Sequence, residues 1–309
     1  MDVQRLELLR ELADRGSVTA VAAATHRTPS AVSQQLKVLE REAGLPLTER
    51  RGRGLVLTSA GRALARSAAD VAVSLAKATA LWDEFRNQAT GEVSLVTFPT
   101  AGQMLLPGVI ANLAAVTGLV LNCADDDPEL SDFPALTADY DIVLAHSMRG
   151  ALSWAGRGLT VVSLMTEPLD VGVPVGHRLA GRSWVSPRDL DGETWIGVTD
   201  GYPFERVLQA IEQESGSRLT VAQRLADLSL IESFVIAGLG IALMPRYTSG
   251  GQPGRLTLIP LRGVEAERQI VALMRPDRAE RLAVRTVIDL LRTRAARVQA
   301  EHAHPLPAR

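Results

Sequence analysis

The residues whose types could do chemistry gather between positions 28 and 53. Small side chains near position 30 would let the backbone approach another molecule closely. Glutamine offers adenine both a donor and an acceptor, and basic side chains suit guanine or phosphate oxygens. The set is Thr28, Ser30, Ala31, Ser33, Gln34, Gln35, Lys37, Arg50, Arg51 and Arg53. This pattern favours contact with double-stranded DNA, and a solvated basic face on a three-helix domain is the alternative.

Three short helices and a hairpin are predicted to position this set. The helix-end signals are Asp2, Ser17 and Thr28 as N-caps, with Gly16 and Gly44 as stops. Residues 47–58 (LTERRGRGLVLT) predict two short strands around a turn. This is the layout of a winged helix-turn-helix, with the helix-turn-helix at about residues 18–37. In that layout the third helix enters the major groove and the wing meets phosphates.

An apolar repeat predicts one long helix from residue 59 to about residue 85. Its members follow one another at spacings of 4 and 3, which is the seam of a coiled coil. They are Leu64, Ala68, Val71, Leu75, Ala78, Trp82 and Phe85. We interpret this seam as a dimer contact, and packing of the helix on its own domain is the alternative.

Composition limits the class of protein. The 309 residues are 46% hydrophobic and 22% charged, as in ordinary globular chains. The longest apolar stretch, 234–244, is too short to span a bilayer, and the single cysteine fits a reducing compartment. We therefore expect a cytoplasmic protein. Residues 1–90 carry 13 basic against 10 acidic side chains, and residues 91–309 carry 20 against 25, so only one end suits a polyanion.

After residue 91 the pattern alternates between strands and helices. Such alternation predicts an α/β body built on a parallel sheet. The predicted strands are 93–98, 119–123, 140–145, 159–164, 169–174, 194–198, 219–224 and 268–274, with a further buried strand within 238–245. The predicted helices are 100–116, 202–214, 229–237 and 277–299.

Residues 1–66 closely resemble the DNA-binding domain of LysR-type transcriptional regulators. The resembling run is RGSVTAVAAATHRTPSAVSQQLKVLEREAGLPLTERRGRGLVLTSAGRAL, with the family's recognition-helix and wing-entry motifs. The resemblance continues at Asp141-Ile142, at Glu167-Pro168-Leu169 and through GLGIALMP (238–245). The chain departs from the family pattern at Thr25, Arg27, Gln34 and Thr48; Thr48 replaces an apolar aromatic residue at the base of the wing.

The resemblance implies an all-α winged helix-turn-helix followed by a two-lobed effector domain like a periplasmic binding protein. Its expected parts are a DNA-binding domain (1–58), a dimerisation and linker helix (59–88), an effector domain (92–300) and a flexible tail (301–309). Lobe 1 would hold about 92–163 and 267–300, and lobe 2 about 164–266. In α/β folds of this kind, ligands sit at strand ends and helix N-termini.

The resemblance also implies an effector site between the lobes. The expected effector-binding residues are Thr97, Phe98, Pro99, Thr100, His146, Thr199, Asp200, Tyr202, Asp227 and Leu228. Each also has a simpler interpretation as a cap or a loop residue. Between Arg86 and Arg149 the chain has no Lys or Arg but eight acidic residues. An anion would need helix N-termini, hydroxyls, or Arg149, Arg206 or Arg224, so we expect a neutral, zwitterionic or weakly acidic effector.

The implied function is sequence-specific transcription regulation controlled by a small-molecule effector, without a cofactor, a metal or a membrane partner. The implied partners are DNA, the effector and further copies of the chain as a dimer or tetramer, with RNA polymerase as a further candidate. A binding protein whose head has lost DNA contact is one alternative. An enzyme is another, although the sequence holds no GxSxG, P-loop or metal motif. We expect residues 125–127 to form a solvated acidic loop and Cys123 to be a buried structural thiol.

Overall fold

Side-chain caps fix the three helices at the start of the chain. In a computed structural model, which describes residues 1–52, 54–86, 89–114, 116–249 and 254–302, Asp2, Ser17 and Thr28 each accept a hydrogen bond from a backbone N–H of the following helix. Gly16 and Gly44 end two of these helices in the left-handed conformation, as the sequence predicts. The helices are α1 (Val3–Arg15), α2 (Val18–Ala24) and α3 (Pro29–Ala43).

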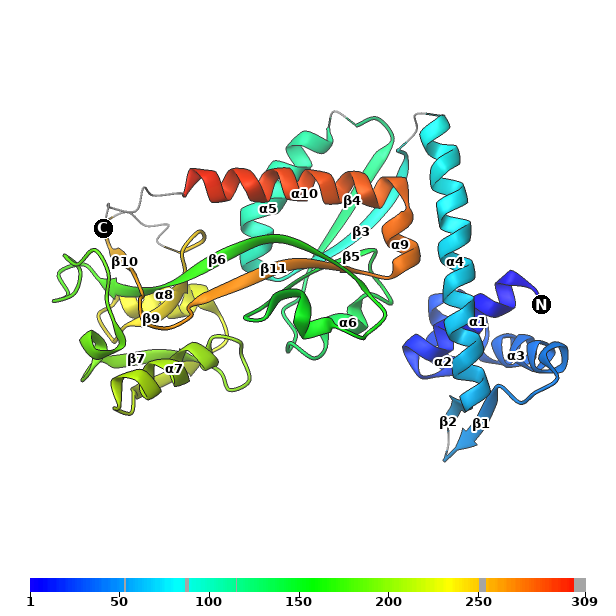
Figure 1. The fold of residues 1–309 in the computed structure, drawn as a ribbon, viewed down its shortest axis with the longest axis horizontal. Coiled ribbons are helices and arrows are strands. Elements are labelled where there is room, and N and C mark those ends of the chain that lie inside the picture. Colours follow the sequence, from blue (N-terminus) through cyan, green and yellow to red (C-terminus); the bar gives the residue numbers. More distant parts are fainter. Residues whose placement is uncertain (53, 87–88, 115, 250–253, 303–309) are drawn as a thin grey trace.

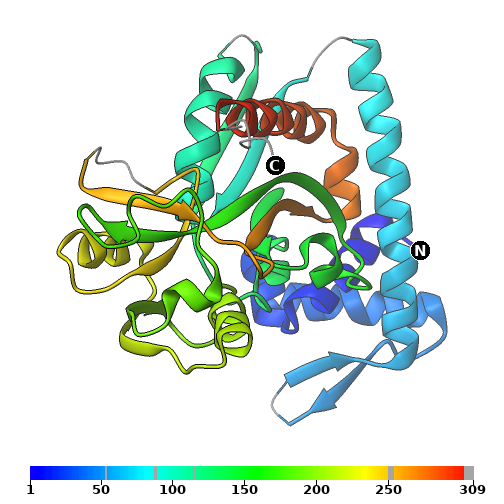
Figure 2. The same ribbon diagram turned by 60° about the vertical axis from the view of Figure 1, so that its left-hand side comes forward.

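Helices α1–α3 and the following hairpin form one unit, which we call the head. It packs around one small apolar core, to which α1 contributes Leu9 and α3 contributes Leu36 and Leu39. Strands β1 (Thr48–Arg51) and β2 (Gly54–Leu57) pair antiparallel and form the predicted wing. Leu47 and Leu57, at the base of the wing, are buried in the same core. The wing therefore has a fixed base, and strands β1 and β2 project from the head (Figure 2).

Helix α4 (Ser59–Phe85) begins at its Thr58 cap and extends beyond the head (Figure 1). Ala68 of the predicted seam is buried against the head, and Leu64 is partly buried there. The remaining seam residues are exposed in the single chain, including Leu75 at 56% and Phe85 at 82%. The seam thus has two parts: one packs within the head, and the other presents an uncovered apolar row.

Lobe 1 is built on the parallel strands β4, β3 and β5 and on helices that cover them. The antiparallel strands β11 and β6 extend the sheet in the order β10-β6-β11-β5-β3-β4, so the sheet is mixed rather than parallel throughout. The strands of this sheet are β3 (Gly91–Thr97), β4 (Leu119–Asp125), β5 (Ile142–Ser147), β6 (Thr160–Pro174), β10 (Leu256–Pro260) and β11 (Glu267–Met274), of which β10 packs in the core of lobe 2. The helices of lobe 1 are α5 (Pro99–Leu113), α6 (Phe133–Leu136), the 3-10 helix η1 (Gly150–Trp154), α9 (Pro276–Glu280) and α10 (Leu282–Glu301).

Lobe 2 has a separate apolar core. Strands β7 (Thr194–Val198) and β8 (Thr220–Leu225) pair in parallel, while β9 (Ala242–Pro245) pairs with the far half of β6. Helices α7 (Glu205–Ser215) and α8 (Leu228–Ile236) and the 3-10 helix η2 (Pro187–Leu190) complete the lobe. The two lobes are therefore joined through strands that belong to both.

Two further sequence expectations about elements are wrong, and one strand was missed. The strands predicted at 159–164 and 169–174 are one strand, β6, because the run between them pairs with β11 and carries the chain from lobe 1 into lobe 2. The C-terminal helix is broken into α9 and α10 at Arg281, whose extended backbone lets its side chain pair with Asp141 at 2.8 Å. Strand β10 was not predicted.

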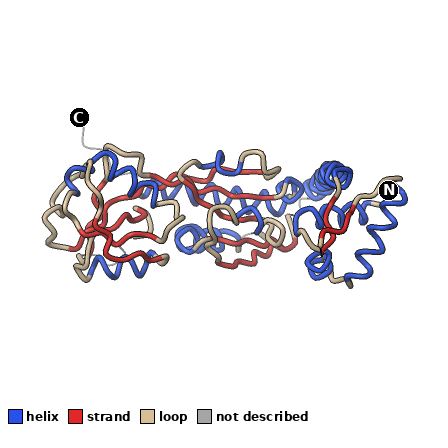
Figure 3. Tube along the Cα trace, turned by 90° about the horizontal axis from the view of Figure 1, so that it is seen from below, coloured by secondary structure: helices blue, strands red, loops and turns tan. Residues whose placement is uncertain are grey.

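The head, lobe 1 and lobe 2 lie in a row (Figures 1 and 3). Ion pairs join α1 to lobe 1: Arg275 Nη1 lies 2.6 Å from Glu11, and Arg15 Nη1 lies 2.6 Å from Asp139. Glu11 and Arg275 are both buried at this junction. Burial alone would raise the pKa of the Glu11 carboxyl, but Arg275 and Arg15 lower it below its usual value. Within the described residues, no helix has the length and apolar character needed to cross a membrane.

Gly61, in the first turn of α4, lets the helix approach the wing entry closely. A Cβ atom at this position would lie 2.0 Å from the Leu47 carbonyl oxygen. We predict that Gly61→Ala lowers the free energy of unfolding by about 1–3 kcal/mol, because the backbone must shift to relieve the clash. Gly181→Ala is the control, since nothing lies within 4 Å of its added Cβ. Equal melting temperatures for the two variants would contradict the close approach.

Candidate functional site

Helix α3 presents one exposed polar face. Thr28 caps its start, Pro29 takes the first helical position, and Val32, Leu36 and Leu39 hold the opposite face in the head core. Ser30, Gln34 and Lys37 are exposed on the outer side. These three residues are therefore available to another molecule.

Three other members of the predicted set are less exposed. Ala31, Ser33 and Gln35 are all of intermediate burial. Ser33 Oγ donates to the Pro29 carbonyl oxygen at 2.9 Å. The Gln35 side-chain oxygen accepts a hydrogen bond from Arg5 of α1 at 3.1 Å, so this amide faces into the head. On the outer face of α3, the Gln34 side chain is consequently more accessible to another molecule than the Gln35 side chain.

Glu40 of α3 anchors the wing. One of its carboxylate oxygens accepts hydrogen bonds from Leu47 N at 2.9 Å and from Thr48 N and Thr48 Oγ1 at 2.8 Å. The hydroxyl of Thr48, which departs from the family pattern, thus gains a polar partner where an aromatic residue is usual. Strand β1 then carries Arg50 and Arg51 with exposed side chains, and Arg53 lies outside the described residues.

A cavity of about 500 Å³ separates the two lobes at the start of α5 and α8. Eight of the ten expected effector residues line it: Pro99, Thr100, His146, Thr199, Asp200, Tyr202, Asp227 and Leu228. Thr97 and Phe98 are buried and do not line it. Phe98 instead packs against the ring of His146, with 4.4 Å between ring centroids. The sequence therefore places most of the cavity wall correctly, and we call this cavity the cleft.

The other lining residues were missed. They are Gln103, Asp127, Pro128, Glu129, Leu130, Phe133, Gly201, Pro203, Ala226 and Ser229. Part of the acidic run after β4 is more than a solvated loop, because Asp127 reaches the cleft and its Oδ1 lies 3.5 Å from His146 Nε2. The run following a parallel strand was the available signal, since ligands gather at the carboxyl ends of such strands. His146 itself lies within β5, which ends at Ser147 and not at Ala145.

A fully buried ion pair lies beside the cleft. Arg268 of β11 and Glu167 of β6 are directly opposite across the strand pair, with Arg268 Nη2 2.7 Å from Glu167 Oε2. The same Nη2 donates to Thr100 Oγ1 at 2.8 Å. The guanidinium lies 5.1 Å from the Phe98 ring of lobe 1 and 5.6 Å from the Phe204 ring of lobe 2. Arg268 therefore connects the lobes at the start of α5.

Burial sets the protonation of the groups in the cleft. Desolvation lowers the pKa of His146, with Asp127 opposing this effect and Arg268 adding to it. Burial, reinforced by the Asp127 charge, raises the pKa of the Tyr202 hydroxyl far above its usual value. At neutral pH, His146 and Tyr202 are consequently both uncharged.

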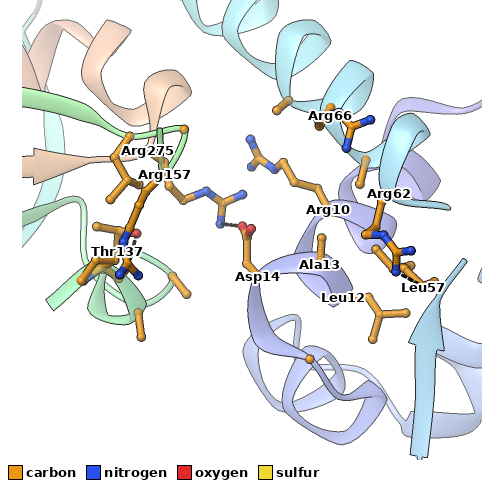
Figure 4. A pocket seen from close by; sticks show the side chains of 18 of the residues that line it. Arg10, Leu12, Ala13, Asp14, Leu57, Arg62, Arg66, Thr137, Arg157 and Arg275 are labelled. Carbon is orange, nitrogen blue, oxygen red and sulfur yellow. Dashed lines mark hydrogen bonds and ion pairs between the residues drawn. The ribbon is translucent and has the colours of Figure 1, made fainter. Parts of the chain in front are cut away.

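A second cavity of about 950 Å³ lies between the head and lobe 1 (Figure 4). Its charged lining comprises Arg10, Arg51, Arg62, Arg66, Arg157 and Arg275, against Asp14, Glu49 and Asp277. Arg275 pairs with Asp14 across it at 3.4 Å. This lining extends the positive charge of the wing towards lobe 1.

Cys123 is not buried, contrary to expectation. It lies exposed on β4, the edge strand of the main sheet. Partial burial still raises the pKa of its thiol. Within the described part of the chain, no cluster of three or more His, Cys, Asp or Glu side chains could hold a metal ion.

Comparisons with known families match both parts of the chain. The family described as "Bacterial regulatory helix-turn-helix protein, lysR family" matches residues 3–62, and the family described as "LysR substrate binding domain" matches residues 86–296. Together they cover the head, the start of α4 and both lobes.

Individual relatives align over most of their length. A hydrogen peroxide-inducible genes activator of Pectobacterium carotovorum is 25% identical over 89% of this chain and 91% of its own. The transcriptional dual regulator GltC of Bacillus subtilis is 26% identical over 91% of this chain and 92% of its own. Among solved structures, a full-length OxyR variant from Pseudomonas aeruginosa has a TM-score of 0.63 at 18% identity, over 94% of this chain and 98% of that one. CbnR in complex with its target DNA has a TM-score of 0.55 at 18% identity, over 96% of this chain and 100% of that one. At these identities, the solved structures support the fold.

The buried, neutral His146 makes stability depend on pH. Its pKa is lowered in the folded state, so below about pH 6.5 the unfolded chain binds a proton that the folded chain does not. Its contribution to the free energy of unfolding is therefore lost as pH falls, by up to about 1.4 kcal/mol per pH unit. We predict that His146→Gln shows a shallower loss between about pH 7.5 and pH 5.5 in urea unfolding. A His146→Gln curve parallel to that of the unmodified protein would refute the assignment.

Proposed function

The chain belongs to the LysR family of bacterial transcription regulators, which are not enzymes, and from this premise we propose how its own residues act. We infer that α3 and the wing bind operator DNA, with α3 in the major groove and the wing arginines at phosphates. A small-molecule effector held in the cleft controls this binding. Regulators of this family bind such effectors rather than cofactors.

The observation that carries the proposal is the outer face of α3. Ser30, Gln34 and Lys37 are exposed there, while the opposite face of the helix is held in the head core. A glutamine can pair with adenine through two hydrogen bonds, and a lysine can reach guanine or a phosphate. The exposed Arg50 and Arg51 of the wing supply sequence-independent contacts beside this face.

We propose that the exposed part of α4 joins two copies of the chain. Val71, Leu75, Ala78, Trp82 and Phe85 form the uncovered row, which a second α4 would bury. A homodimer, or a tetramer that also uses the effector domains, would present paired recognition helices to a palindrome-like site. RNA polymerase is a further proposed partner. We propose that the protein acts in the cytoplasm, where it meets DNA.

The division into domains follows from the same proposal. Residues 1–58 bind DNA, 59–88 dimerise and 92–300 bind the effector. Of the tail expected at 301–309, Glu301 is the last residue of α10, and residues 303–309 lie outside the described residues. Effector binding acts on DNA by favouring one arrangement of the lobes over another, which requires a different affinity for each arrangement.

The name of the Pectobacterium relative raises peroxide sensing as a function for this chain, and the cysteine chemistry argues against it. With Cys123 as its one cysteine, the chain can form no disulfide within itself. The raised pKa of this thiol disfavours the thiolate, which is the reactive form. The proposed effector is therefore a bound molecule and not an oxidant of this chain.

We predict different effects on DNA binding from α3 and from the wing. Gln34→Ala weakens binding to the preferred operator by about 1–3 kcal/mol relative to other sequences, because it removes a base contact. Arg50→Ala weakens binding to every sequence alike and makes the salt dependence shallower by about one phosphate contact. Gel-shift titrations on the DNA upstream of the gene, at two salt concentrations, measure both effects.

The control for these titrations is Gln213→Ala, an exposed glutamine in lobe 2 that should leave DNA binding unchanged. If Arg50→Ala altered the preferred sequence while Gln34→Ala weakened all sequences equally, the two roles would be reversed. If the unmodified protein had no affinity for that DNA, it would be a small-molecule binding protein that has lost DNA contact.

We predict that Leu75→Asp breaks the dimer, because it places a carboxylate in the apolar row of α4. Sedimentation velocity should show a shift from dimer or tetramer towards smaller species. Leu152→Asp, at an exposed leucine in lobe 1, is the control that retains the assembly. An unchanged assembly for Leu75→Asp would mean that α4 is not the contact.

A further inference from the structure

We propose that the effector is an organic cation, a small molecule with an ammonium or guanidinium group that faces Asp127 and Glu129 in the cleft. This inference rests on the proposed effector function of the cleft and assigns the chemical class of its ligand. It follows from the charge of the cleft, from an unpaired buried nitrogen and from the aromatic wall.

The first argument is the charge of the lining. Four carboxylates line the cleft, namely Asp127, Glu129, Asp200 and Asp227, and its described lining residues include no Lys or Arg. The nearby Arg268 is fully buried and is neutralised by Glu167. These carboxylates disfavour a negatively charged ligand and favour a cation. The sequence expectation of a neutral, zwitterionic or weakly acidic effector is replaced here, because Asp127 and Glu129 also line the cleft while Arg149, Arg206 and Arg224 do not.

Two of the four carboxylates remain available to a ligand. Asp227 caps α8 by accepting hydrogen bonds from Ser229 N and Leu230 N, and Asp200 lies 3.4 Å from Arg224 outside the cleft. The Glu129 carboxylate has no hydrogen-bond or ion-pair partner among the described residues. Asp127 lies 3.5 Å from His146, which is neutral at pH 7, and forms no ion pair with a Lys or Arg among the described residues, so its charge is not balanced.

The second argument is a buried nitrogen without a partner. His146 is 1% exposed and lines the cleft, yet its Nδ1 makes no hydrogen bond within the described part of the chain. Its Nε2 lies 3.5 Å from Asp127, and a carboxylate there favours the tautomer with the proton on Nε2. Nδ1 is then an acceptor, and it requires a donor such as the N–H of an ammonium or guanidinium group.

The third argument is the aromatic wall beside these carboxylates. The rings of Phe133 and Tyr202 line the cleft and both lie against the His146 ring, with centroid separations of 5.8 and 5.6 Å from it. Aromatic faces attract cations, and more strongly when water is excluded. The N-terminus of α5, where Pro99 and Thr100 line the cleft, favours negative charge. An amino acid could therefore place its carboxylate there, and a simple amine would leave that end empty.

The experiment measures ligand binding by thermal shift and then by calorimetric titration, at constant ionic strength, on the full-length protein. Putrescine, agmatine, lysine, arginine and choline are the cationic probes, butane-1,4-diol is the neutral probe and succinate is the anionic one. We expect at least one cationic probe to raise the melting temperature, and the diol and succinate to leave it unchanged. Lysine or arginine binding more tightly than the amines would locate the carboxylate at α5.

Matched variants place the binding in the cleft. Asp127→Asn and Glu129→Gln should each weaken the Kd of the bound cation about tenfold. Asp126→Asn removes the same charge from the neighbouring residue, which does not line the cleft, and should retain the Kd. A further reading of the melting temperature without ligand shows whether each variant is folded.

Three outcomes would overturn the inference: no cationic probe binds, succinate binds more tightly than every cation, or Asp126→Asn weakens the Kd as much as Asp127→Asn. DNA binding is measured on the same preparation. If the unmodified protein binds DNA and one of these outcomes is found, the cationic ligand alone is refuted. If the unmodified protein does not bind DNA, the proposed function is refuted.

Discussion

The two lobes depend on a buried charge that must remain paired. Arg268 and Glu167 are both fully buried and lie opposite each other on the paired strands β11 and β6. Removing either partner from such a buried pair typically costs about 3–5 kcal/mol of stability. The Arg268 guanidinium also contacts an aromatic ring from each lobe and the hydroxyl of Thr100 in the cleft. The geometry of the cleft wall is therefore tied to the position of a single arginine.

Strand β11 joins the cleft to the head. Arg268 lies near its start beside the cleft, and Arg275 directly follows its end, where it pairs with the buried Glu11 of α1. One strand thus carries a buried arginine at each of the two functional regions. Opposite charges are separated along this axis, with arginines at the wing and carboxylates in the cleft. A ligand in the cleft and DNA at the head are consequently recognised by different chemistry.

The sequence predicts local features well and long-range pairing poorly. The caps Asp2, Ser17 and Thr28 mark the head helices correctly, because N-cap chemistry is encoded within a few residues. The continuity of β6 and the burial of Arg268 against Glu167 depend on a partner a hundred residues away, which periodicity does not reveal. Cys123 lies exposed on β4, whose position at the edge of the sheet is set by strand order and not by the local sequence. Asp127 lines the cleft together with Pro128, Glu129 and Leu130, and only their position after a parallel strand pointed to this.

Hydroxyl-radical footprinting of the full-length protein on the DNA upstream of its own gene tests the central claim most directly. The account predicts two protected segments on one face of the duplex, with centres about one helical turn (10–10.5 base pairs) or a multiple apart, because a joined pair of heads places two α3 helices in successive major grooves. Uniform cleavage along the DNA, with no protected segments, would contradict it.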